Sequence, residues 1–124
     1  MLVGGENMKE KFNYLDYDSA MEYVGFSDEI YKIVLDTYVS DERTEQLAEA
    51  FAAQDWDNYR ILAHGVKSTS KTIGANELSE LAKTMEFAVK DNTIDVILDG
   101  HAAFLEAYKS MVQRISDDLA SMED

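Results

Sequence analysis

Apolar residues recur at three- and four-residue spacing along most of this chain, which is the pattern of amphipathic helices that each bury one stripe. Proline is absent, and there is no run of alternating β-branched residues that would predict a strand. The pattern predicts six helices, at about 17–24, 28–40, 41–53, 56–73, 76–90 and 93–120. We therefore predict an all-α fold.

The residues at the predicted helix ends support these boundaries. Asp16, Ser27 and Asp55 are residue types whose side chains cap a helix N-terminus, and Gly74 suits the left-handed position that follows a last turn. Gly100 lies inside the last predicted helix, where glycine costs roughly 1 kcal/mol of helix propensity relative to alanine. Its presence there indicates close packing or a mild bend.

Short loops join the last four predicted helices, which favours an antiparallel up-down four-helix bundle. The two short N-terminal helices would then cover one end or one side of it. We expect residues 1–12, with the flexible pair Gly4-Gly5, to form a disordered lead, and residues 13–122 to form one bundle domain. In the predicted helix 28–40, the residues expected to face inward are Ile30, Ile33, Val34 and Tyr38.

Composition narrows the possible partners and surroundings. The chain has 25 acidic and 11 basic residues and a net charge of −14, which argues against nucleic acid or an anionic membrane as a partner. It has no cysteine, no signal-peptide pattern and no stretch of the roughly 20 apolar residues that would span a membrane. We expect a cytoplasmic monomer, and the short segments that flank the bundle favour a protein that stands alone.

The predicted helix 56–73 carries a histidine on its polar face. At about 100° per residue, an apolar stripe falls opposite His64. The side chains that share the histidine's face include Arg60, Ile61, Lys67, Ser68 and Lys71. Nearby cations disfavour a charged imidazole ring, so its free lone pair could act as a nucleophile, and the same cations would attract a phosphoryl group. From periodicity alone, a solvated surface histidine remains the alternative.

The residues around this histidine form a spaced motif. An alanine precedes the histidine, an aliphatic residue, a lysine and a small residue follow, and a glycine-alanine pair comes ten and eleven positions after it: Ala63, His64, Val66, Lys67, Ser68, Gly74 and Ala75. This segment resembles the signature of the histidine phosphotransfer (HPt) domain family. Gln54-Asp55-Trp56 resembles the family's turn before the histidine helix, and Leu78 and Leu81 match its leucine spacing. Ser68 stands where the family usually has glycine.

The resemblance implies a four-helix-bundle phosphocarrier in two-component signalling, which passes phosphoryl groups between the aspartates of receiver domains. It implies that His64 is the phosphoacceptor and that Lys67 neutralises the phosphoryl charge. The residues that would dock the partner are Arg60, Ile61, Gly65, Ser68 and Lys71. The resemblance further implies a carrier rather than an enzyme, with no kinase domain and no cofactor of its own. Its partners would be response-regulator receivers, which supply Mg²⁺, and a hybrid histidine kinase is a further candidate.

Other readings of the same residues remain open. A helical bundle could use the face around His64 to bind signalling partners without being phosphorylated. His101 lies in the apolar stripe of the last predicted helix, so we interpret it as a packed histidine rather than a reactive one. A metal-binding bundle would need Glu-x-x-His pairs, but Ile61 and Leu98 stand three residues before the two histidines. We therefore expect no metal site, and the absence of a Gly-rich phosphate loop argues against nucleotide binding.

Overall fold

The computed structural model describes residues 7–122, which form helices and turns and contain no strand. The helices are α1 (Met8–Lys11), α2 (Tyr17–Val24), α3 (Asp28–Ser40), α4 (Thr44–Ala52), α5 (Trp56–Ile73), α6 (Asn76–Lys90) and α7 (Ile94–Ala120). Within the described range, no helix is both long enough and apolar enough to cross a membrane. The predicted all-α fold is confirmed.

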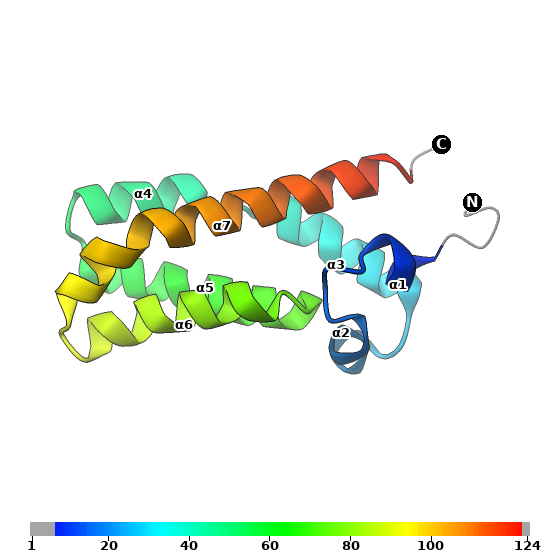
Figure 1. Cartoon of the computed structure of the whole chain (residues 1–124), viewed down its shortest axis with the longest axis horizontal. Helices are drawn as coiled ribbons and strands as arrows, with labels where there is room; N and C mark the ends of the chain where they lie inside the picture. Colours follow the sequence, from blue (N-terminus) through cyan, green and yellow to red (C-terminus); the bar gives the residue numbers. More distant parts are fainter. Residues whose placement is uncertain (1–6, 123–124) are drawn as a thin grey trace.

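Three long helices and two shorter ones build the bundle (Figure 1). Helices α5, α6 and α7 follow one another through short turns, and α6 packs against both of the others. At about 1.5 Å per residue, the 27 residues of α7 span about 40 Å, whereas the nine residues of α4 span only about 14 Å. Helices α3 and α4 each pack against α5 and α7, so together they occupy the fourth position of the bundle.

The predicted disordered lead at 1–12 is wrong for the part that the structure describes. Asn7 caps α1 by accepting a hydrogen bond from the backbone N–H of Glu10, at 2.9 Å. Met8 and Phe12, one turn apart, are 2% and 0% exposed and belong to the core. Burial of these two side chains stabilises a four-residue helix that would not persist alone. Residues 1–6 lie outside the described residues.

The inward face of α3 also differs from the prediction. Tyr38 is buried as predicted, but Ile30 and Ile33 are 48% and 57% exposed, and the buried Tyr31 was not predicted to face inward. The Tyr31 hydroxyl donates to a backbone carbonyl of α5 at 2.8 Å, and the Tyr38 hydroxyl pairs with Ser70 Oγ at the same distance. The tyrosines combine apolar burial with hydrogen bonds to α5, so they occupy the inward stripe and turn the two isoleucines toward solvent.

Gly74 joins the N-terminal helices to the end of the bundle. Its φ of +88° is left-handed, and a Cβ there would lie 2.5 Å from the backbone oxygen of Asp16. In turn, the Asp16 N–H donates to the Gly74 carbonyl at 2.9 Å, and the Asp16 side chain caps α2. Only glycine allows this close crossing. It places α2 over the end of the bundle where α5 turns into α6, as expected, whereas α3 forms part of the bundle itself.

Gly100 packs closely against α6. A Cβ at this position would lie 2.7 Å from Cε of Met85, which is itself buried. Close packing, one of the two interpretations of this glycine, is therefore confirmed.

His101 is a packed histidine, as predicted. It is 8% exposed, and its ring stacks on Phe51 with 3.9 Å between centroids and 2° between planes. Its Nδ1 lies 2.8 Å from the Tyr59 hydroxyl. Burial lowers the pKa of His101, because the charged ring would lose its hydration.

This shift predicts how stability depends on pH. The unfolded chain takes up a proton at His101 as the pH falls through about 6.5, whereas the folded protein resists it. The free energy of unfolding should therefore decrease between about pH 7.5 and pH 5.5. His101→Phe, which keeps a ring against Phe51, should lose most of that decrease. Urea denaturation of both proteins in a His64→Gln background, which contains no second histidine, measures the difference. Equal pH slopes would contradict the prediction.

Candidate functional site

The structure places His64 on the outer face of α5, halfway along the helix. Asp55 caps this helix by accepting from the N–H of Asn58, and Gly74 ends it in the left-handed conformation. Ala63 and Val66 are buried, whereas the side chain of His64 is 56% exposed. The periodicity of α5 therefore presents an accessible imidazole ring on a regular helix.

A buried carboxylate on α6 organises the side chains around His64. Glu86 is 1% exposed, and its Oε2 lies 2.9 Å from His64 Nδ1. Its Oε1 lies 2.8 Å from Lys67 Nζ, and its Oε2 lies 3.4 Å from Lys90 Nζ. One carboxylate thus holds the histidine and two ammonium groups where α5 and α6 pack together.

The protonation state of Glu86 determines the tautomer of His64. Burial by itself raises the pKa of Glu86, but its contacts with Lys67, His64 and Lys90 outweigh burial and lower the pKa to about 2. The carboxylate is therefore ionised at neutral pH and can only accept hydrogen bonds. The hydrogen bond at Nδ1 then requires the ring to carry its proton on that nitrogen. In the neutral ring, the lone pair is on Nε2.

Lys67 is held in the same network, one turn after His64. Its side chain is 24% exposed, and its ammonium lies 5.6 Å from the centroid of the Phe87 ring as well as against Glu86. Ser79 Oγ of α6 donates to the Lys67 backbone carbonyl at 2.8 Å, which fixes the approach of the two helices at this level. The cation is therefore positioned beside the imidazole but still reaches solvent.

The other predicted site residues share the outward face without joining this network. Ile61 is 56% exposed, and Gly65 is half-buried. Lys71 and Ser68 line a hollow between α5 and α6, together with Lys67. Arg60 forms no ion pair with a residue of the described range. Of the three cations expected around His64, only Lys67 belongs to the network around the histidine.

Glu86 and Lys90 are the members of the network that the sequence analysis missed. The buried positions of α6 include Leu78, Ser79, Ala82, Met85 and Glu86, and they repeat at three-four spacing. That spacing places Glu86 within the buried stripe, and a buried carboxylate needs partners that carry positive charge. The buried stripe of α6 could therefore have identified Glu86 as a partner of the cations on α5.

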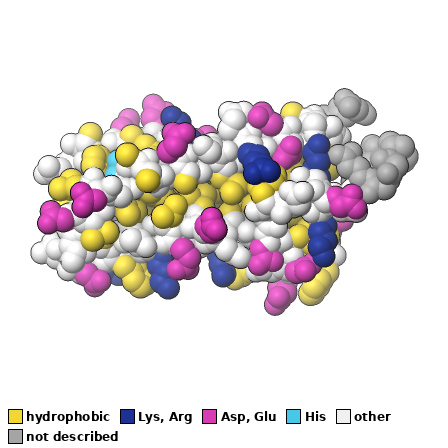
Figure 2. All heavy atoms as spheres, in the orientation of Figure 1, with side chains coloured by type: hydrophobic (Ala, Val, Ile, Leu, Met, Phe, Trp, Pro, Cys, Tyr) yellow, Lys and Arg dark blue, Asp and Glu magenta, His cyan; other side chains and the backbone are white. Residues whose placement is uncertain are grey.

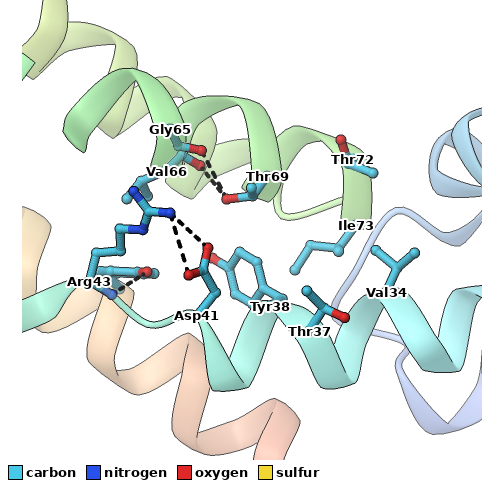
Figure 3. Close-up of a pocket in the computed structure, with 11 residues that line it drawn as sticks. Val34, Thr37, Tyr38, Asp41, Arg43, Gly65, Val66, Thr69, Thr72 and Ile73 are labelled. Atoms are coloured by element: carbon cyan, nitrogen blue, oxygen red, sulfur yellow. Dashed lines mark hydrogen bonds and ion pairs between the residues drawn. The ribbon is translucent and has the colours of Figure 1, made fainter. Parts of the chain in front are cut away.

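A separate cavity of about 210 Å³ lies between α3 and α5 (Figure 3). Its lining is mostly apolar, and its charged lining residues, Asp41 and Arg43, pair with each other at 3.1 Å. Gly65 lines the cavity, and a Cβ added there would meet nothing within 4 Å. The cavity borders the histidine's helix but contributes no group to the network around Glu86. Residues 7–122 also contain no cluster of His, Cys, Asp or Glu that could hold a metal ion.

Comparison with known proteins assigns the family. The model of the Hpt domain matches residues 39–118, roughly two-thirds of the 124-residue chain. No curated protein and no solved structure matches the chain. His64, Lys67, Glu86 and Lys90 all lie within the matched residues. The protein therefore belongs to the Hpt domain family, whose members serve phosphotransfer in two-component signalling.

Proposed function

We propose that this protein is a histidine phosphocarrier that accepts a phosphoryl group on Nε2 of His64. The donor is the aspartyl phosphate of one receiver domain, and the acceptor is the receiver of a response regulator. The observation that carries the proposal is the 2.9 Å contact between His64 Nδ1 and the buried carboxylate of Glu86. It keeps the proton on Nδ1, so the lone pair of the exposed ring lies on Nε2.

The transfer step needs no proton to move. The Nε2 lone pair attacks phosphorus and forms an N–P bond, while the P–O bond to the receiver's aspartate breaks and its electron pair returns to the carboxylate. The imidazole becomes a cation that still carries its proton on Nδ1, and the negative charge of Glu86 stabilises it. Passing the group onward reverses these steps, because the neutral ring is the leaving group. The receiver supplies Mg²⁺. The remaining acceleration of transfer comes from positioning the reacting atoms and from neutralising the phosphoryl charge.

We assign Lys67 to neutralisation of the phosphoryl oxygens. Its ammonium can turn from Glu86 Oε1 toward a phosphoryl group on the neighbouring ring, because Lys90 and His64 remain on the carboxylate. Around this centre, the residues that we propose for docking are Arg60, Ile61, Gly65, Ser68 and Lys71. Small side chains at 65 and 68 let the receiver's active site come close to the ring, and Ile61 offers an apolar contact.

We further propose that the protein is a cytoplasmic monomer that brings no cofactor and no kinase activity of its own. Its partners are response-regulator receivers, together with a hybrid histidine kinase that would supply the phosphoryl group. The high negative charge supports a single bundle that stays dissolved and does not self-associate.

His64→Gln tests the proposed acceptor. Incubation with phosphoramidate should add one acid-labile phosphoryl group to the parent protein and none to the variant, as measured by intact mass. A glutamine amide can still donate to Glu86, so circular dichroism should show an unchanged bundle. Labelling of the variant at the parent's level would refute His64 as the acceptor. A parent protein that binds receivers but never becomes labelled would instead be an interaction module.

Glu86→Gln tests the role of the buried charge. The amide oxygen can still accept from Nδ1, but it cannot neutralise the ring cation or the two lysines. We expect transfer from a phosphorylated receiver to slow by about 10- to 100-fold and the free energy of unfolding to fall by about 1–3 kcal/mol. Rapid-quench kinetics and urea denaturation measure these effects. Glu49→Gln, the same change at an exposed position of α4, is the control. Equal transfer rates for the two variants would rule out the role.

Gly65→Ala separates stability from docking. A Cβ there meets nothing within 4 Å, so the variant should gain up to about 1 kcal/mol of stability from helix propensity. Labelling by phosphoramidate, a small donor, should not change. Transfer from a receiver should slow, because the added methyl group lies next to the phosphoacceptor. Unchanged receiver transfer would remove Gly65 from the docking surface, and a loss of stability would show that packing requires the glycine.

A further inference from the structure

A half-exposed aromatic ring lies next to Glu86 and gathers three lysines. Phe87 of α6 is 40% exposed. The ammonium groups of Lys90, Lys67 and Lys83 lie 4.9, 5.6 and 5.6 Å from its ring centroid, within the range of cation–π attraction. We refer to Phe87, Lys67, Lys83 and Lys90 as the Phe87 cluster.

The cluster concentrates positive charge on a strongly acidic protein. Only 11 residues of the chain are Lys or Arg, against 25 acidic ones, and acidic side chains are spread over the face shown in Figure 2. Glu86 binds two of the cluster's lysines, Lys67 and Lys90. Lys83 forms no ion pair with a residue in the described range, so its charge is available to a partner. Three ammonium groups at one apolar ring form a surface that suits an anionic partner.

The Phe87 cluster is continuous with the site around His64. Lys67 and Lys90 share the Glu86 carboxylate with the histidine. Lys83 lines two hollows of the surface. In the first it lies with Lys67, Ser68, Lys71 and Glu80, and in the second it lies with Glu80, Phe87, Asp91 and Val96. The surface therefore runs from α5 across α6 to the first turn of α7, beyond the docking residues that the sequence indicated.

We propose that the Phe87 cluster is a second docking point for the receiver domain, and this inference rests on the proposed function. The Phe87 cluster binds an apolar side chain of the receiver that is flanked by carboxylates. A receiver that holds Mg²⁺ at its phosphorylation site needs carboxylates there, so the surface next to His64 in the complex carries acidic groups. The overall charge of −14 repels an acidic partner at long range, and the lysines here provide local attraction. Charge complementarity and continuity with the site both favour the receiver as the occupant.

The proposed contact acts on binding rather than on the chemical step. The ring loses its remaining exposure to water when the receiver docks, and aromatic residues at the centre of an interface often contribute strongly to affinity. The ammonium groups accelerate encounter with an acidic surface, and salt screens that effect. Loss of Phe87 or Lys83, which have no role in the proposed transfer step, should therefore raise the receiver concentration that half-saturates transfer and should leave the saturated rate unchanged.

Two pairs of variants test the inference. Phe87→Ala should raise the half-saturating concentration of phosphorylated receiver about tenfold, and Lys83→Ala should weaken the salt dependence of transfer at low receiver concentration. The controls lie at exposed positions of α7: Leu98→Ala truncates another apolar side chain, and Lys109→Ala removes another lysine. Leu98 lies about 200° around α7 from Val96, so it faces away from the hollow beside Phe87.

Labelling by phosphoramidate separates this inference from the proposed function, because that donor needs no docking surface. Two results together support the inference. Phosphoramidate should label Phe87→Ala like the parent protein, and the half-saturating concentration of phosphorylated receiver should be higher for Phe87→Ala than for Leu98→Ala. The inference is overturned if these two variants have the same half-saturating concentration, or if Lys83→Ala and Lys109→Ala have the same salt dependence. Lys83 is exposed, so the second comparison holds even if Phe87→Ala does not fold. A parent protein that phosphoramidate does not label overturns the proposed function, and the inference with it.

Discussion

The carboxylate of Glu86 is the constraint on which the rest of the site depends. Glu86 is 1% exposed, and burying an unpaired charge costs several kcal/mol of folding free energy. Helices α5 and α6 can therefore pack around Glu86 only if cations and hydrogen-bond donors reach its carboxylate. Lys67, Lys90 and His64 meet that need, and each is positioned by doing so. The contact that makes the buried carboxylate tolerable also keeps the proton of the ring on Nδ1 and holds a cation beside the exposed imidazole.

A site with no deep cleft can still be well ordered when regular helices build it. His64 and Lys67 lie one turn apart on α5, and the hydrogen bond from Ser79 to the Lys67 carbonyl sets the distance to α6. The close crossing at Gly74 fixes the end of the same helix pair. Side chains on packed helices keep their geometry better than side chains on loops. The bundle can therefore present an exposed imidazole in a defined orientation.

The sequence predicted features that periodicity and end residues encode, and it missed those that depend on contacts between distant segments. Asp55 and Gly74 bound α5, and its apolar stripe placed His64 outside. The spacing of α6 places Glu86 in its buried stripe, but Glu86 was missed because charged residues are expected on a solvated face. The face of α3 was predicted correctly at Tyr38, but Tyr31 was missed, because its hydrogen bond to α5 favours the tyrosine over two isoleucines. A four-residue helix shows no period, so the burial of Met8 and Phe12 had no local signal.

The charge distribution suits a carrier that must exchange partners. In the proposed function, a net charge of −14 would oppose the approach of an acidic receiver to most of the surface, whereas the lysines of α5 and α6 would attract it at the site. Long-range repulsion combined with local attraction selects the orientation of the partner more than it raises affinity. The reason is that a partner approaching in any other orientation is repelled. The same opposition would keep such a complex short-lived, which the proposed carrier needs if it is to leave one receiver and reach the next. Additional cations would strengthen docking, but they would also slow release and so limit the carrier.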